Sequence, residues 1–234
     1  MHRLATGLFL ALIGIGVAPA AAQWKGKGEV GLVYARGNSE TETANLRIDA
    51  ARELPRWKHA FGVAALRSAT RDEKTAQRAG ASWQSDGKLT GRAYWFGGLR
   101  YERDEFSGFD YQASGSTGFG YPFLDTERTR FSGQAGVGYA RRELAPTGEM
   151  ESDAILRGDL KLDHGLTATT RVLNTLVVEA GAENTFVSNV LALQARMTDR
   201  FALSVGLDLR HNTDPPAGLG RTDTLTTLSL VYAF

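Results

Sequence analysis

Apolar side chains alternate with polar or small ones along most of the chain, and this period of two constrains the fold more than any other feature. The clearest stretch is residues 201–210, where Phe, Leu, Val, Leu and Leu occupy one face and Ala, Ser, Gly, Asp and Arg occupy the other. Successive side chains of a β-strand point to opposite faces, whereas a helical face repeats every 3.6 residues. The alternation therefore predicts an all-β structure.

The first 22 residues have the composition of a secretory signal peptide. His2 and Arg3 form a short polar start, residues 8–17 are apolar, and alanines at 20–22 supply the small residues that a signal peptidase reads. A single membrane-spanning helix, the alternative, would need a longer apolar stretch. We therefore expect cleavage after Ala22, export of the chain, and one mature domain at residues 23–234.

Twelve segments follow the alternating pattern, and turn residues separate them. The mature chain has 234 − 22 = 212 residues, or about 18 for each segment and its connection, which suits a tilted membrane-crossing strand of ~9–11 residues and a turn. The segment at 57–70 fits least well, and we expect a β-bulge there. The segments lie near residues 27–36, 41–53, 57–70, 76–86, 89–104, 110–122, 127–143, 152–164, 170–184, 186–198, 200–212 and 221–234.

The connections between these segments alternate in length. In outer-membrane barrels the termini and the short turns face the periplasm, and the longer loops face outside. The pattern therefore indicates an antiparallel up-and-down barrel of about twelve strands, within a range of about 10–14. The short connections are 53–56, 86–88 and 198–199, and the longer polar ones are 72–75, 103–109, 144–151 and 213–220.

Two architectures share a period of two, and their faces are inverted. A soluble sandwich or lipocalin-like barrel buries its apolar face in a core, whereas a membrane barrel turns that face to lipid. The polar faces here hold many small residues, such as Ser114, Ser116, Gly118 and Gly136, which a crowded lumen needs and a solvent face does not. Aromatic residues also gather near the segment ends, where interfacial girdles lie. These features favour a transmembrane β-barrel, which must close because an open sheet edge cannot face lipid.

Charge and cysteine content exclude several functions. Removal of residues 1–22 takes away only Arg3, which leaves 27 − 1 = 26 basic and 26 acidic side chains. A nucleic-acid-binding protein would show a basic excess, so we expect no nucleic acid partner. The chain has no cysteine, which excludes disulfides, thiolate catalysis and cysteine-ligated metals.

Charged residues on the polar faces are expected to line the lumen, where opposite charges can pair across strands. One interpretation is a salt-bridge network that fills the interior, and the other is a narrow polar channel whose rings of charge select a small solute. Twelve strands lie between filled eight-stranded barrels and wide sixteen-stranded porins, and the many long inward side chains favour the occluded form. The residues assigned inward are Arg47, Asp49, Arg78, Arg92, Arg100, Glu102, Arg157, Asp159, Lys161, Glu179, Asp208 and Arg210.

Four stretches carry a resemblance to a known family. They are GLVYARGNSETETANLRIDA at 31–50, RYERDEFSGFDYQASGSTGFGYPFLDTERT at 100–129, DAILRGDLKLDHGLT at 153–167 and RHNTDPPAGLGRTDTLTTLSLVYAF at 210–234. They resemble the YdiY-like family, Gram-negative outer-membrane β-barrels described as salt-induced and grouped as a domain of unknown function. The resemblance implies an outer-membrane location, a barrel and no established biochemical activity. The salt-induced label concerns regulation rather than chemistry.

A catalytic site is the alternative function, and only the neighbourhood of His211 suggests one. Asp208, Asp214 and Asp223 are near it in the sequence, and the histidine could act as a base on a lipid or peptide at the barrel rim. However, residues 212–216 read Asn-Thr-Asp-Pro-Pro, which is the composition of a solvated turn. No calcium loop or phosphate-binding glycine loop is recognised. We expect no enzyme activity, no cofactor and no bound metal, and a soluble periplasmic ligand-binding barrel is the remaining alternative.

The segment TLTTLSLVYAF at 224–234 reads as a final strand. We expect Leu228, Leu230, Tyr232 and Phe234 to face lipid, and this strand to pair with the first one so that no edge remains. The ending is similar to the C-terminal signal that outer-membrane barrel-assembly machinery recognises, which implies that Tyr232 and Phe234 form an assembly signal. The expected partners are therefore outer-membrane lipid and the assembly machinery, with the barrel itself a monomer.

Overall fold

The computed structural model describes residues 24–35, 41–70, 73–89, 91–105, 107–145, 147–216 and 218–234, and all regular structure in them is β. The signal peptide predicted for residues 1–22 lies outside these ranges. Within the described part of the chain, no helix is long and apolar enough to cross a membrane.

The strands follow the predicted segments to within five residues at each end. The largest shift is at the fifth segment, because the Leu89 amide donates to the Ala93 carbonyl across a turn and the strand starts only at Tyr94. The strands are β1 (Trp24–Ala35), β2 (Thr41–Glu53), β3 (Trp57–Thr70), β4 (Glu73–Lys88), β5 (Tyr94–Asp104), β6 (Phe109–Asp125), β7 (Thr129–Leu144), β8 (Met150–Gly165), β9 (Thr170–Ala180), β10 (Thr185–Arg196), β11 (Phe201–Asn212) and β12 (Thr222–Ala233).

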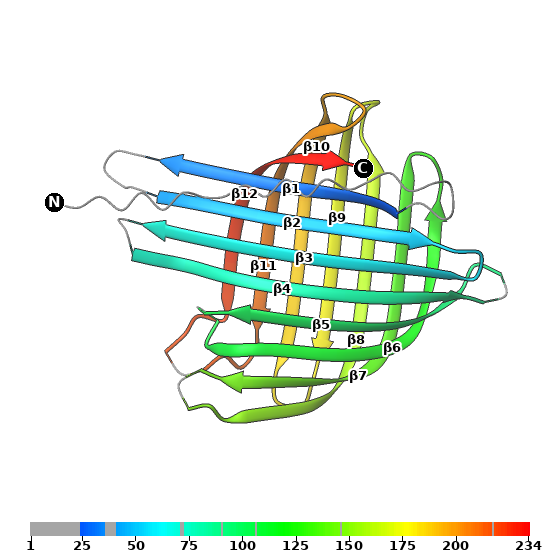
Figure 1. Ribbon diagram of the computed structural model, residues 1–234. Coiled ribbons are helices and arrows are strands. Elements are labelled where there is room, and N and C mark those ends of the chain that lie inside the picture. Colours follow the sequence, from blue (N-terminus) through cyan, green and yellow to red (C-terminus); the bar gives the residue numbers. More distant parts are fainter. Residues whose placement is uncertain are drawn as a thin grey trace.

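Each strand pairs antiparallel with its neighbours in the chain, and β12 pairs with β1 to close the barrel. In Figure 1 the strands of the near wall, β1 to β5, run across those of the far wall, as the tilted strands of a barrel do. At the seam Gly28 pairs with Tyr232 and Val30 with Leu230. Two further hydrogen bonds extend the seam, from Gly26 N to Phe234 O at 2.9 Å and from Phe234 N to Gly26 O at 3.0 Å.

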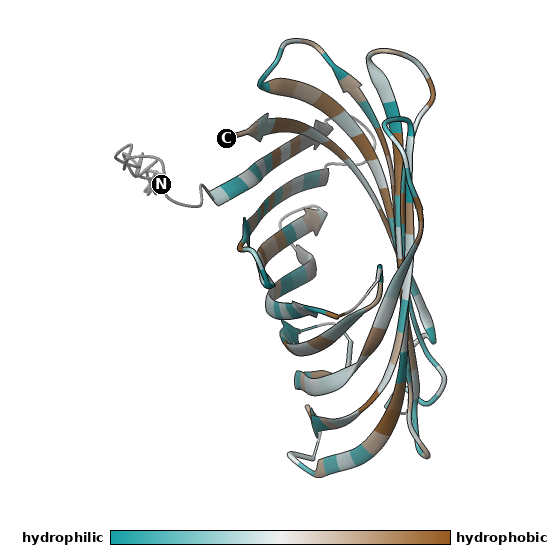
Figure 2. Ribbon diagram, turned by 90° about the vertical axis from the view of Figure 1, so that its right-hand side faces the viewer, coloured by the Kyte–Doolittle hydropathy of each residue, from teal (hydrophilic) through white to brown (hydrophobic). Residues whose placement is uncertain are grey.

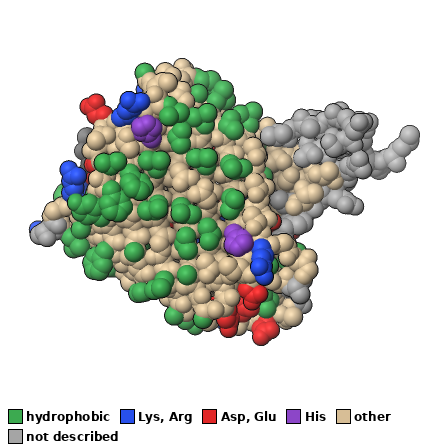
Figure 3. Space-filling model, turned by 180° about the vertical axis from the view of Figure 1, so that it is seen from behind, with side chains coloured by type: hydrophobic (Ala, Val, Ile, Leu, Met, Phe, Trp, Pro, Cys, Tyr) green, Lys and Arg blue, Asp and Glu red, His purple; other side chains and the backbone are tan. Residues whose placement is uncertain are grey.

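The two faces of the strands have opposite chemistry, and the apolar one points outward. Leu32, Leu156 and Phe119 are 73%, 67% and 64% exposed, whereas the inward Asp159 and Glu179 are each 3% exposed. Figure 2 shows the alternation as bands of opposite hydropathy along the strands, and Figure 3 shows apolar side chains spread over the outside of the far wall. A lipocalin-like barrel would have the reverse arrangement. The predicted membrane-type β-barrel is therefore confirmed.

Local irregularities occur in a few strand pairs. The pairing of β3 with β4 shifts between Ser68 and Ala69, where the extra residue, Thr75, is on β4. The bulge therefore lies in the partner strand and not in the segment at 57–70 for which it was expected. Between β6 and β7, an added Cβ at Gly118 would lie 2.2 Å from the Ala135 carbonyl oxygen, and one at Gly136 would lie 2.2 Å from that of Thr117. Glycine on the inward face therefore lets these two strands approach closely.

Candidate functional site

The lumen holds the largest concentration of buried charge in the described residues. Alternation along β5 places Arg100, Glu102 and Asp104 on the inward face. The inward positions of β4, β8, β9 and β11 carry six further charges that are about one-fifth exposed or less: Arg78, Arg157, Asp159, Glu179, Asp208 and Arg210. Inside a barrel these side chains cannot reach bulk solvent freely, so each needs a partner of opposite charge.

The first group of ion pairs joins β4 and β5 to β11. Arg78 Nε lies 2.7 Å from Asp104 Oδ2, and Arg78 Nη1 lies 3.3 Å from Asp208 Oδ2. Arg210 pairs with Glu102, and its Nε lies 3.4 Å from Asp208 Oδ2. Around the barrel, β4 is five strands from β11 and β5 is six strands from it. These pairs therefore cross the lumen rather than run along one wall.

The second group joins β5 to β8 and β9 through Glu179. Its two carboxylate oxygens each lie 2.7 Å from an arginine, Arg100 on one side and Arg157 on the other. Ser114 Oγ also donates to Glu179 at 2.8 Å, and Arg157 pairs with Asp159 at 2.7 Å. β5 and β9 are four strands apart around the barrel, so this group also bridges the lumen.

The two groups meet at Arg100, whose Nη1 lies 3.9 Å from Glu102 Oε2. The Arg100 guanidinium also stacks over the ring of Phe186, 4.5 Å from its centroid, a cation–π contact. A cavity of only about 10 Å³ remains between Arg100, Arg142, Glu179 and Phe186, and that volume suits about one water molecule. Side chains therefore fill this part of the lumen.

On the side of the network nearer to the chain termini, polar amides continue the packing. Gln134 Nε2 donates to Asp159 at 3.0 Å, and Gln84 Nε2 donates to Gln134 at 3.2 Å. Phe96, which is inward on β5, is also fully buried. These contacts extend the filled region beyond the ion pairs.

The structure does not bring all predicted inward residues into this network. Arg47 and Asp49 pair with each other on β2 at 2.9 Å and are more exposed, at 45% and 29% of their side chains. Lys161 is inward by alternation but largely exposed. The prediction that Arg92 lines the lumen is corrected by the structure. Arg92 lies in the turn before β5 and is exposed, so strand alternation does not place it in the lumen. The remaining predicted residues, Arg78, Arg100, Glu102, Arg157, Asp159, Glu179, Asp208 and Arg210, lie in the two ion-pair groups.

Three buried charged residues of the lumen, Asp104, Arg142 and Asp153, are not among the residues predicted to face inward. Asp104 ends β5 but falls in a segment that reads as a loop. Arg142 pairs with Asp153 at 3.1 Å and with Glu151 at 3.3 Å, near the end of the barrel opposite to the termini. The same alternation places Arg142 and Asp153 inward, so the signal was present in the sequence.

The neighbourhood of His211 does not form a catalytic cluster. His211 is on the outward face of β11, and its Nδ1 lies 2.8 Å from Thr222 Oγ1. Asp208 points inward to Arg78 and Arg210, and Asp223 is paired in register with Arg210. Strand alternation thus separates the histidine from these two carboxylates. In the described residues, no three His, Asp or Glu side chains converge as metal ligands.

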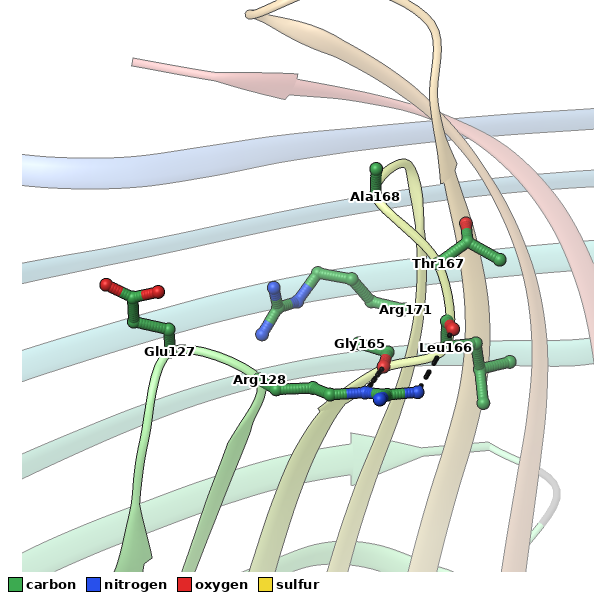
Figure 4. A pocket seen from close by; sticks show the side chains of 7 residues that line it. All are labelled: Glu127, Arg128, Gly165, Leu166, Thr167, Ala168 and Arg171. Atoms are coloured by element: carbon green, nitrogen blue, oxygen red, sulfur yellow. Dashed lines mark hydrogen bonds between the residues drawn. The ribbon is translucent and has the colours of Figure 1, made fainter.

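A second hollow lies at the end of the barrel that holds the chain termini. It has a volume of about 450 Å³, between the β6–β7 and β8–β9 turns, and Figure 4 shows the side chains around it. Arg128 donates from Nε to the Gly165 carbonyl at 2.9 Å and from Nη2 to that of Leu166 at 3.4 Å. Arg171 donates to Asp163 at 2.6 Å. Both arginines therefore tie neighbouring turns and strands together.

The C-terminal residues predicted as an assembly signal lie on the outward face at this same end. Tyr232 stands between two other rings, with centroids 5.2 Å from Phe201 and 6.4 Å from Phe234. Tyr232 and Phe234 are 37% and 46% exposed. They form an aromatic group beside the seam between β12 and β1.

Comparisons with known proteins agree with this architecture. The family model "Protein of unknown function, DUF481" matches residues 28–234. The chain is 25% identical over 227 residues to an uncharacterized protein, YdiY, of Escherichia coli (strain K12), which covers 92% of this chain and 86% of that protein. The crystal structure of an outer membrane channel from Pseudomonas putida F1 superimposes with a TM-score of 0.55 at 11% identity, over 93% of this chain and 97% of the other. This last similarity concerns the fold, a β-barrel like those of outer-membrane channels.

Proposed function

The chain belongs to the DUF481 family, whose function is unknown, and we propose that it is an outer-membrane barrel whose lumen is closed by ion pairs. The observation that carries this proposal is the pairing across the lumen. Arg100 meets Glu179, and Arg78 meets Asp208, although the strands of each pair lie in opposite walls. A solute that follows this part of the lumen would have to separate these pairs. The proposed role is therefore that of a structural, stress-responsive envelope barrel.

Three observations support the membrane placement. The outward face is apolar, the barrel has no open edge in the described residues, and its fold is like that of an outer-membrane channel. A surface of exposed leucine and phenylalanine of this extent is unfavourable in water and favourable in lipid. The termini and short turns then face the periplasm, and the longer connections face outside.

A narrow channel is the second candidate, and the exposure of one part of the wall favours it. Lys27, Arg47 and Asp49, inward on β1 and β2, have side chains 36%, 45% and 29% exposed, whereas the arginines of the bridging network are 14–17% exposed. Water therefore reaches the lumen beside these two strands. A path for small ions along them is compatible with closure to larger solutes.

We also propose that assembly machinery of the outer membrane reads the C-terminal strand, with Tyr232 and Phe234 as the recognised side chains. Both are outward and accessible beside the closing seam. The barrel needs no second copy to close, because β1 and β12 of the same chain pair with each other. A monomer in the outer-membrane lipid is therefore the proposed state.

Liposome swelling and membrane fractionation test the proposed function. The protein should remain with outer membranes in high salt and leave them only in detergent. Proteoliposomes that contain it should swell in a small sugar no faster than empty liposomes, whereas an open porin gives rapid swelling. Release by salt without detergent would contradict the membrane placement, and swelling at a porin's rate would contradict the closed lumen.

A further inference from the structure

The outward surface of the barrel has a hollow of about 580 Å³ over β3 to β7. Its lining comes from two adjacent rows of outward residues that run across these strands. Small residues, Ala81, Ala113 and Gly115, lie at its floor, and larger ones such as Leu99 and Tyr139 stand beside them. Small side chains among large ones make a depression in a surface that otherwise meets lipid evenly.

The occupant of this hollow must be largely apolar. Leu99 and Tyr139 are 60% and 58% exposed, and Val63, in the same lining, is 55% exposed. Contact with hydrocarbon chains would bury this apolar surface in an apolar environment, which is favourable. In a membrane, the acyl chains of a lipid have that chemistry.

One end of the hollow is basic. Arg141 lines it directly, and Arg103 lies two residues beyond Tyr101 on the same outward face of β5. Both arginines are exposed, and neither makes an ion pair with any residue that the structure describes. Two carboxylates, Glu105 and Glu143, lie two residues beyond Arg103 and Arg141 along the chain. The two arginines are therefore the charged groups nearer to the hollow, and the carboxylates lie further toward the end of the barrel.

The position of these arginines selects one leaflet of the membrane. Arg103 is next to the last residue of β5, and Arg141 is close to the end of β7, at the end of the barrel opposite to the termini. This inference rests on the proposed membrane function, in which that end faces outside. Because one strand separates β5 from β7, their backbones lie about 10 Å apart, and Arg103 is two residues further along than Tyr101, which is level with Arg141. Two cations at such a separation suit a head group with two phosphates.

We propose that this hollow, defined by Ala81, Leu99, Ala113, Gly115, Tyr139 and Arg141, binds a phosphorylated, multiply acylated glycolipid of the outer leaflet. The acyl chains lie over the small residues of the floor. The phosphates accept hydrogen bonds from Arg103 and Arg141, whose planar guanidinium groups match phosphate oxygens. The lipid occupies the outside of the wall and does not enter the lumen.

Native mass spectrometry of the folded barrel in detergent, titrated with lipid A or with phosphatidylglycerol, tests this site. The wild-type barrel should retain lipid A in preference to phosphatidylglycerol. The R103Q/R141Q variant should bind lipid A about tenfold or more weakly, because two charge-assisted contacts are lost. The A113L variant, which fills the floor and keeps both arginines, should also bind less lipid A. The matched control, R92Q/R200Q, removes two exposed arginines at periplasmic turns and should bind like wild type.

The outcomes separate this proposal from the proposed function. Equal binding of lipid A by wild type and R103Q/R141Q, or equal binding of both lipids by wild type, would overturn the site while the barrel still inserts into bilayers. Failure of the wild-type chain to insert would instead overturn the membrane function. If R103Q/R141Q does not fold, the single R141Q variant should still show about threefold weaker binding or more, and unchanged binding there would overturn the site.

Discussion

Replacement of Glu179 by Gln removes the carboxylate at the centre of the ion-pair network. Glu179 is 3% exposed and accepts hydrogen bonds from Arg100 and Arg157 at 2.7 Å and from Ser114 at 2.8 Å. The Gln amide keeps one oxygen acceptor but no charge. Arg157 retains Asp159 at 2.7 Å, whereas the one carboxylate that Arg100 retains among the described residues is Glu102, at 3.9 Å. The main loss therefore falls on Arg100.

Removing one partner of a buried ion pair costs about 3–5 kcal/mol of folding free energy, because the other charge stays buried alone. Arg100 and Arg157 are 17% and 14% exposed, so lumen water compensates part of this loss. We therefore expect the lower end of the range, about 3 kcal/mol, for E179Q. The matched control is E53Q, because Glu53 pairs with Lys88 at 3.0 Å but is 70% exposed. Exposed pairs of this kind contribute only about 0–1 kcal/mol.

Urea unfolding in lipid vesicles measures this difference. The folded fraction can be followed on unheated gels, on which a folded barrel migrates faster than the unfolded chain. A destabilisation of E179Q below about 1 kcal/mol, or equal to that of E53Q, would refute the reasoning. It would mean that Arg100 and Arg157 are well hydrated and that the lumen is not packed at their level.

Three further predictions concern folding, assembly and chemistry. G118A should prevent formation of the folded band, because its Cβ would lie 2.2 Å from the Ala135 carbonyl oxygen, whereas G28A, with no atom within 4 Å of its Cβ, should fold normally; equal folding of both would contradict the close approach of β6 and β7. Deletion of Phe234 should lower the amount of barrel in outer membranes, measured by blotting of membrane fractions, and unchanged levels would count against the C-terminal signal. H211A should leave the envelope lipid profile unchanged, since His211 faces outward and bonds to Thr222, and an altered profile would revive a catalytic role.

The sequence predicts the strands and their faces well because the alternation is strict where one side of the wall is lipid and the other a crowded lumen. Glu179, Asp208 and Arg210 are therefore placed inward from parity alone. Arg92 is misplaced because Asp86-Gly87 is a strong turn signal. The turn is instead closed by the hydrogen bond from Leu89 to Ala93, with Gly91 at a φ of +78°. Gly87 stays in β4, and the ring of Trp57 lies 3.2 Å from where its Cβ would be.

The partners of the inward charges could not be predicted from the sequence. Parity fixes the face of a residue but not the residue opposite it across the lumen, which depends on strand tilt and on how the barrel closes. Arg100 and Glu179 are 79 residues apart, and Arg78 and Asp208 are 130 apart. Neighbouring opposite charges, such as Arg157 and Asp159, are visible in the sequence, but they do not reveal that the network spans two walls.

Single-channel recording in planar bilayers tests the closed lumen most directly. Wild-type protein should insert without a steady current, and R100A/E179A should conduct. That double variant removes a bridge while Arg157 keeps Asp159 and Glu102 keeps Arg210. The control variant K88A/E53A removes an exposed ion pair and should stay silent. A large steady current through the wild-type barrel, equal to that of R100A/E179A, would contradict the account.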